Sequence, residues 1–345
     1  MPSKLAADPR VDPRLKALFG AMEVTPASDV SSREEVLVQD NSPVALARWA
    51  AMSAFFAACD TETIAPSAGL ETGEHTATSS PDGNTIRIRL IRPGTDQTVA
   101  AVYYIHGGGM ASMSCDLGNY RAFGRMIANN GVAVAMVDFR NCVTPSSVSE
   151  VAPYPAGLND CVSGFRWLAG RAGEFGIDPG RIVIAGESGG GNLTLASGLR
   201  LTREGEAGRV KGLYALCPYI LGAWPDPAAP SSVENNGILL DLHNNRGRYG
   251  YGIEAYERRD PLAWPGFATE DDVKGLPPTV IRVNECDPLR DEGINFYRLL
   301  LRAGVRARGV QSMGTIHGTE VFPMACPEIS REAARDIAAL ARDPL

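Results

Sequence analysis

Long hydrophobic runs are missing from this 345-residue sequence. The longest apolar stretches, such as residues 99–105 and 132–137, are far shorter than the roughly 20 residues that a membrane-spanning helix needs. The first twenty residues also lack the apolar core of a secretory signal. These absences argue against a membrane partner, and they lead us to expect a cytoplasmic protein.

Clusters of positive charge are also missing. The chain has 33 Lys and Arg residues against 40 Asp and Glu residues, a formal net charge of −7, and no run rich in Lys or Arg. A nucleic-acid-binding domain normally carries a basic patch, so we expect no nucleic-acid partner.

Paired cysteines are a third absence, since the seven cysteines stand singly, with no C-x-x-C and no Cys/His cluster. This pattern argues against a disulfide framework and against a zinc site. Most of the seven are expected to be small buried hydrophobic residues. They are Cys59, Cys115, Cys142, Cys161, Cys217, Cys286 and Cys326.

What the sequence does have is an alternation of apolar strand-like runs with amphipathic helical patterns. Helices are expected at residues 158–171 and 193–203, between strand candidates. This alternation predicts an α/β fold in which a mostly parallel central sheet is covered by helices on both faces. The strand candidates are residues 86–90, 99–105, 132–137, 182–185, 212–217 and 279–283.

Two segments do not show this alternation of strand and helix patterns. Residues 1–75 are rich in alanine and helical patterns, and residues 220–275 combine prolines with aromatic side chains such as Trp224 and Trp264. The aromatic content argues against a disordered linker. We expect residues 1–75 to be the N-terminal part of a cap and residues 220–275 to be its second segment. The catalytic core then comprises residues 76–219 and 276–345.

A serine surrounded by glycines follows the apolar run 182–185, in the sequence Gly186-Glu187-Ser188-Gly189-Gly190. A serine held at a sharp strand-to-helix turn needs neighbours without bulk. The helix that follows directs its free N–H groups toward that position. Because chance alone yields G-x-S-x-G in roughly one such chain in five, its place between strand and helix strengthens the prediction of a nucleophile.

A second glycine motif, His106-Gly107-Gly108-Gly109, follows the strand candidate 99–105. Such a loop brings backbone N–H groups close to a substrate oxygen, as in the oxyanion loops of lipases and esterases. A phosphate-binding loop is the rival interpretation, but neither G-x-G-x-x-G nor a Walker lysine accompanies it.

A nucleophilic serine needs a base, and the base needs a carboxylate to orient it. In this type of sheet the three residues occur along the chain in the order Ser, acid, His. Asp287 comes just after the strand candidate 279–283, and His317 comes just after the run 310–313. His317 is the only histidine C-terminal to Asp287, and we expect His75, His106 and His243 to have structural roles. The nearby acids Glu285, Asp291 and Glu292 are the alternatives to Asp287, with turn or helix-terminal roles otherwise.

The sequence resembles the hormone-sensitive-lipase family of α/β-hydrolase esterases in its motifs and in their order. These motifs are HGGGM, PYPAGLNDC, GESGGG, DPLRDEG and the late IHG. The resemblance covers roughly residues 85 to 325. It implies an α/β-hydrolase fold with a helical cap, a nucleophile at Ser188, a general base at His317 and an orienting carboxylate at Asp287. It also implies an oxyanion hole formed by the N–H groups of Gly108, Gly109 and Gly189.

The same resemblance implies a serine carboxylesterase that acts on small esters of short to medium acyl chain, with lactones as a further candidate class, and needs no metal or organic cofactor. Homodimers occur among such proteins, so the oligomeric state stays open. The chain departs from the family pattern at Glu187, where Asp is common, at Gly189, where Ala is common, and at residues 139–144. These departures concern the shape of the pocket.

Other functions on the same scaffold are alternatives. A non-hydrolytic ligand-binding protein would lack the catalytic histidine and a lyase would have an altered oxyanion loop, whereas His317 and residues 106–109 are present. Amide or carbamate hydrolysis stays open, and the sequence singles out no substrate-binding residue. Cys286, beside Asp287, is interpreted as a packing residue, with oxidation sensing as the alternative.

Overall fold

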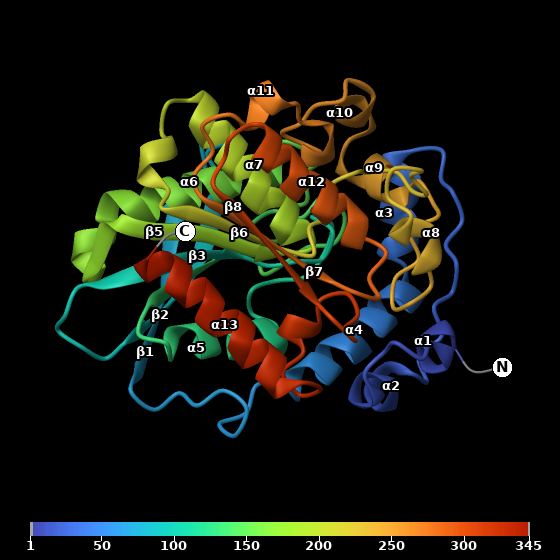
Figure 1. The fold of residues 1–345 in the computed structure, drawn as a ribbon, viewed down its shortest axis with the longest axis horizontal. Coiled ribbons are helices and arrows are strands. Elements are labelled where there is room, and N and C mark those ends of the chain that lie inside the picture. The colour runs from blue at the N-terminus through green and yellow to red at the C-terminus, as the bar shows by residue number, and fades with distance from the viewer. Residues whose placement is uncertain (1–2, 344–345) are drawn as a thin grey trace.

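A computed structural model describes residues 3–343 and contains one eight-stranded sheet (Figure 1). The strand order is β1-β2-β4-β3-β5-β6-β7-β8. Strand β2 pairs antiparallel with both β1 and β4, and all other pairs are parallel. The sheet is therefore mostly parallel, which confirms the predicted fold class.

The strands are β1 Leu70–Thr78, β2 Thr85–Pro93, β3 Val99–Ile105, β4 Ala133–Asp138, β5 Ile177–Glu187, β6 Gly212–Leu216, β7 Thr279–Asn284 and β8 Ala307–Ser312. The α-helices are α1 Lys4–Ala7, α2 Pro13–Phe19, α3 Arg33–Asp40, α4 Pro43–Ala57, α5 Gly118–Ala128, α6 Ala156–Arg171, α7 Gly189–Arg203, α8 Ser231–Glu234, α9 Arg246–Tyr251, α10 Ile253–Glu257, α11 Glu270–Val273, α12 Arg290–Arg302 and α13 Pro327–Arg342.

Helices cover both faces of the sheet, with α6, α7 and α12 on one face and α5 and α13 on the other (Figure 1). Alternate side chains of β3 enter the two cores, so that Tyr103 lies under the first group of helices and Tyr104 under the second. Because both faces are buried, the central strands are apolar throughout rather than alternating. This burial explains why the predicted strands were recognisable as continuous apolar runs.

Strand β1 was not predicted. Its sequence, LETGEHTAT, is polar and most of its side chains are at least partly exposed, since it lies at the edge of the sheet. An edge strand with little burial on either face gives neither an apolar run nor a clear alternation. The cap boundary expected at residue 75 falls inside this strand.

Two segments lie outside the sheet and its covering helices. The N-terminal segment, residues 3–57, contains α1 to α4, and the insertion, residues 218–278 between β6 and β7, contains α8 to α11. They lie side by side in Figure 1, where α3 is next to α9. Arg246 of α9 pairs with Asp40 of α3 at 2.5 Å, and the Lys4 ammonium donates to the carbonyl of Asn236 at 2.8 Å.

All seven cysteines are unpaired in the structure and all are buried, which confirms the expectation that most of them are buried residues. In the described range 3–343, no helix combines the length and the apolar character needed to cross a bilayer.

Candidate active site

The serine motif forms a sharp elbow between a strand and a helix. Strand β5 ends at Glu187, α7 begins at Gly189, and Ser188 stands between them with φ 57° and ψ −116°. A positive φ is uncommon for a residue with a side chain and costs free energy that the surrounding structure must supply. A Cβ on Gly190 would lie 2.1 Å from the carbonyl oxygen of Ile105, so the close approach of β3 to α7 excludes any larger residue there.

The three side chains expected to form a triad come together at the C-terminal ends of the strands. Ser188 Oγ lies 2.9 Å from His317 Nε2, and His317 Nδ1 lies 2.8 Å from Asp287 Oδ2. All three residues are buried. The arrangement lets the serine donate its proton to Nε2 while the Nδ1–H group donates to the carboxylate.

The electrostatic environment favours a charged form of His317. Burial disfavours the charged ring, but the charge of Asp287 and its hydrogen bond outweigh this effect and raise the pKa of His317 above its ordinary value. A basic imidazole beside a serine is suited to accept the hydroxyl proton.

Asp287 is fully buried, and its second oxygen, Oδ1, accepts a hydrogen bond from the N–H of Leu289 at 2.9 Å. The alternative acids are engaged elsewhere. Glu285 accepts from the N–H of Gly314 at 2.7 Å, Asp291 from the N–H of Ser231 at 2.7 Å, and Glu292 from the indole of Trp224 at 2.6 Å. Of the four carboxylates, Asp287 is the one that contacts His317 Nδ1.

The glycine loop after β3 lies against the serine elbow. Gly108 and Gly109 both have positive φ, 96° and 64°, and both line the cavity that contains Ser188. A Cβ on Gly189 would meet the nitrogen of Gly109 at 2.7 Å, which shows how closely the two backbones approach. Among the hydrogen bonds within residues 3–343, none uses the N–H of Gly108 or Gly109.

The remaining histidines lie outside this constellation. His106 is fully buried, its Nδ1 is 2.9 Å from the carbonyl of Gly107, and its ring stacks on Phe139 at 4.3 Å. His75 lies on β1 against Trp167, and His243 Nε2 is 2.8 Å from the carbonyl of Ser232.

From the sequence, Glu187 was named only as a departure from the family pattern and was given no role in the site. Its side chain is buried, Oε1 lies 3.7 Å from His317 Nε2, and Oε2 accepts a hydrogen bond from the Tyr120 hydroxyl at 2.8 Å. Tyr120 in turn accepts from the N–H of Gly107 at 2.9 Å, so the chain of contacts connects the serine elbow to the glycine loop. Burial raises the pKa of Glu187. Its only signal in the sequence is its position next to Ser188.

A cavity of about 350 Å³ opens onto Ser188, His317 and the two loop glycines. Its walls are mostly apolar and come largely from the N-terminal segment and the insertion, namely Phe19, Met22, Met52, Phe55, Phe56, Tyr219, Leu239, Leu240 and Leu242. The insertion's aromatic residues Trp224, Tyr251 and Trp264 instead pack together in the core.

One group of side chains within residues 3–343 has donor atoms close enough to share a metal ion, namely Glu187, Cys217 and His317, within 4.8 Å of one another. Since Nδ1 of His317 contacts Asp287, the histidine would have to offer Nε2. That nitrogen already faces Ser188 at 2.9 Å. Metal binding there and proton transfer from the serine are mutually exclusive uses of the same atom.

A sequence profile of the α/β-hydrolase fold matches residues 102–321, a range that contains the serine, both glycine loops, Asp287 and His317. The chain belongs to the α/β-hydrolase fold family. Carboxylesterase NlhH of Mycobacterium tuberculosis is 30% identical over 253 residues, which cover 72% of this chain and 76% of that protein.

Solved structures of esterases resemble this hydrolase along nearly its whole length. The structure of esterase Est22 has a TM-score of 0.97 and 64% identity, covering 99% of both chains. Brefeldin A esterase, a bacterial homologue of human hormone-sensitive lipase, has a TM-score of 0.85 and 35% identity, covering 99% of this chain and 95% of that one. The hydrolase is thus a carboxylesterase of the hormone-sensitive-lipase type, acting on small-molecule esters.

Proposed function

We propose that Ser188 is the nucleophile of this carboxylesterase, His317 its general base and acid, and Asp287 the carboxylate that orients His317. The observation that carries the proposal is the continuous relay from Ser188 Oγ to His317 Nε2 at 2.9 Å and from His317 Nδ1 to Asp287 Oδ2 at 2.8 Å. Glu285, Asp291 and Glu292 have other partners.

In the first half of the reaction, Ser188 Oγ attacks the carbonyl carbon of the ester while His317 Nε2 accepts the hydroxyl proton. The carbonyl oxygen becomes a tetrahedral oxyanion. We assign its stabilisation to the N–H groups of Gly108, Gly109 and Gly189, because the first two make no hydrogen bond within residues 3–343 and the third begins a helix. The C–O bond to the alcohol then breaks, and His317 gives its proton to the departing oxygen.

In the second half, water attacks the acyl-serine, and His317 accepts one of its protons. The second tetrahedral intermediate breaks the bond to Ser188, which recovers its proton from His317 as the carboxylic acid leaves. Asp287 stays ionised throughout and stabilises the imidazolium.

We propose short to medium acyl chains as the preferred substrates. The cavity of about 350 Å³ lies at the lower end of the roughly 300–1,000 Å³ that small-molecule sites occupy. Its apolar walls suit the hydrocarbon part of an ester. Est22 has been solved with p-nitrophenol, the alcohol released from p-nitrophenyl esters, which supports these esters as probes. Lactones are a further class to test, since brefeldin A esterase is similar along its whole length.

We further propose that residues 1–75 and 220–275 act as one cap over the core of residues 76–219 and 276–345. Support comes from the cavity walls, where Met52 and Phe55 of the N-terminal segment and Leu239 and Leu240 of the insertion line the cavity that contains Ser188. A cytoplasmic location and a homodimer complete the proposal. Exposed Val44 and Leu46 on α4 suit a dimer contact, which analytical ultracentrifugation would test.

The test of the triad is hydrolysis of p-nitrophenyl esters from acetyl to dodecanoyl by the wild type, Ser188→Ala and His317→Asn. The expected result is a maximum at short acyl chains and loss of turnover in both variants. Ser197→Ala is the matched control, since Ser197 is a buried serine of α7, the helix that follows Ser188, and does not line the cavity. Full activity in a folded Ser188→Ala variant would refute the assignment.

A further inference from the structure

The N-terminal segment packs directly against the two loops that carry the proposed acid and base. A separate hydrophobic cluster joins Leu5, Val11, Leu15 and Phe19 of this segment to Cys286 and Ile316. Cys286 immediately precedes Asp287, and Ile316 immediately precedes His317. Residues 5–19 therefore pack with the residues that immediately precede Asp287 and His317, although more than 260 positions separate the two parts of the sequence.

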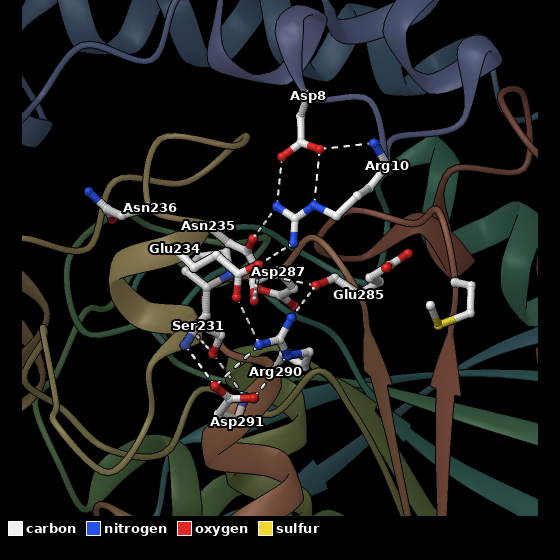
Figure 2. A network of polar contacts seen from close by, with 12 residues as sticks. Asp8, Arg10, Ser231, Glu234, Asn235, Asn236, Glu285, Asp287, Arg290 and Asp291 are labelled. Carbon is white, nitrogen blue, oxygen red and sulfur yellow. Dashed lines mark hydrogen bonds and ion pairs between the residues drawn. The ribbon is translucent and has the colours of Figure 1, made fainter.

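A polar chain of contacts runs beside this cluster, and Figure 2 shows it at close range. Asp8 accepts hydrogen bonds from Arg10 Nε at 3.0 Å and from Arg10 Nη2 at 2.6 Å. Nη2 also donates to Asn235 Oδ1 at 2.8 Å, and Nη1 pairs with Glu234. Arg10 thus connects the N-terminal segment to the end of α8 in the insertion.

Asn235 connects this network to the loop that contains Asp287. It is fully buried, and its Nδ2 donates to the carbonyl oxygen of Asp287 at 3.0 Å and to that of Glu285 at 3.1 Å. A side-chain amide can accept on one side and donate twice on the other, which a carboxylate cannot do. Asn235 therefore ties the main chain on both sides of Cys286 to the insertion, beside Arg290, which donates to the same two carbonyls.

Asp287 is held by its side chain and by its main chain. Its Oδ2 faces His317 and its Oδ1 accepts from Leu289. Its main-chain N–H donates to the carbonyl of Asn284 at 3.3 Å, and its main-chain carbonyl accepts from the N–H of Arg290 at 3.1 Å and from Asn235. Only the contact with Asn235 comes from the insertion, and it depends, through Arg10, on the N-terminal segment. Neither Arg10 nor Asn235 lines the cavity that contains Ser188.

We propose that Arg10 and Asn235 are positioning residues, through which docking of the N-terminal segment sets the place of Asp287 against His317. The proposal rests on the triad assigned above and extends the enzyme's functional residues into both segments outside the sheet.

Loss of the positioning contacts should appear in turnover rather than in substrate binding. Displacements of about 1 Å in a catalytic constellation can lower rates by about 100-fold. For Asn235→Ala we expect kcat to fall by about 10- to 100-fold with KM within about twofold of wild type. For Arg10→Ala we expect a smaller fall of the same kind, because Asn235 keeps its contacts with the two carbonyls.

The pH profile supplies a second readout that a purely structural role would not change. The titratable groups that face the His317 ring are Asp287, Glu187 and Cys217. Asp287 raises the pKa of His317 more than Cys217 does, and the variants leave Cys217 and Glu187 in place. A displaced Asp287 should therefore move the acidic limb of kcat/KM to lower pH in Asn235→Ala.

The experiment compares wild type, Arg10→Ala, Asn235→Ala, the double variant and Asn235→Asp, using p-nitrophenyl acetate kinetics, pH profiles and thermal unfolding. The double variant should resemble Asn235→Ala alone, because the two residues act in series. Asn235→Asp keeps an acceptor for Arg10 but turns an oxygen toward the two carbonyls, so it should be as slow as Asn235→Ala. Arg14→Ala is the matched control, since Arg14 pairs with Asp12 and Glu328 on the same segment and should keep wild-type kcat.

Wild-type kcat and an unshifted pH profile in folded Asn235→Ala and Arg10→Ala would overturn the proposal. If Asn235→Ala does not fold, Arg10→Ala and Arg10→Gln decide it by the same two readouts, because the Arg10 side chain is 26% exposed and its removal leaves the core intact. A failure of the triad itself would look different, since Ser188→Ala would then remain active.

Discussion

Gly189→Ala is the substitution for which the structure gives the sharpest expectation. The added Cβ would lie 2.4 Å from the nitrogen of Met110 and 2.7 Å from that of Gly109. Both contacts are with backbone, so no side-chain rotation relieves them. An ordinary van der Waals contact begins near 3.4 Å, so the glycine loop or the start of α7 must move by about 1 Å.

The movement would separate the donors that we assign to the oxyanion hole. Gly109 lies on one side of the contact and Gly189 on the other, so pushing them apart lengthens at least one hydrogen bond to the developing oxyanion. Loss of one such donor costs about 10²–10³ in kcat, and this is the fall expected for Gly189→Ala. The effect on stability should be modest, because overpacking costs about 1–3 kcal/mol while Ala gains up to about 1 kcal/mol over Gly in a helix.

The assay is kcat for p-nitrophenyl acetate, measured with the thermal unfolding of the same preparation. Gly198→Ala is the matched control, because it lies on the same helix and its Cβ would also meet an atom at 2.4 Å, here the flexible end of the Leu213 side chain. Its kcat should stay near that of wild type. If folded Gly189→Ala kept a kcat within about threefold of Gly198→Ala, the oxyanion assignment would be refuted.

Two further predictions concern protons. Because the Asp287 charge raises the pKa of His317 and only the neutral ring accepts the serine proton, the acidic limb of kcat/KM should have its midpoint above about pH 6.5, and Asp287→Asn should lower it in the activity that remains. A midpoint unchanged by this substitution would contradict that cause. Burial raises the pKa of Glu292 to about 8, against hydrogen bonds from Ile220 and Trp224 that favour the charged form. Since the folded state holds this proton more tightly, its stabilising contribution is complete below about pH 4.5 and is lost as the pH rises to about 8. The difference in unfolding free energy between wild type and Glu292→Gln, from denaturant titrations at about pH 5 and about pH 8, should therefore change by several kcal/mol in favour of the variant. A constant difference would count against the raised pKa.

The central sheet was predictable from the sequence because burial on both faces leaves a continuous apolar run. Strands such as β3 and β7 are buried along their whole length, or nearly so, and each coincides with a predicted run. Strand β1 has no such signal, since an exposed edge strand is held by main-chain hydrogen bonds that any residue can make. Periodicity therefore detects burial, and it misses strands that are stabilised by pairing alone.

The glycines of the site illustrate a second limit. The motifs G-x-S-x-G and HGGG indicated that backbone segments approach each other closely. They did not indicate which glycine is least tolerant of a larger side chain. Gly189 departs from the alanine that is common in similar sequences, and here the glycine loop lies too near for a Cβ. The glycine at this position thus fits the close approach of the two backbones, which the motif alone does not show.

The contacts of the N-terminal segment were beyond prediction for a different reason. Arg10 and Asn235 are 225 positions apart. Arginine is usually an exposed surface residue and asparagine is usually a turn residue, so neither residue type suggests a buried contact. Neither stands at a strand end or inside a motif that carries the chemistry of the reaction. Their significance arises from tertiary position alone, because an amide buried beside Asp287 must find partners for both of its donor hydrogens. Since motifs identify atoms that react and not the contacts that hold them, positioning residues such as these are where a structure adds most to what the sequence indicates.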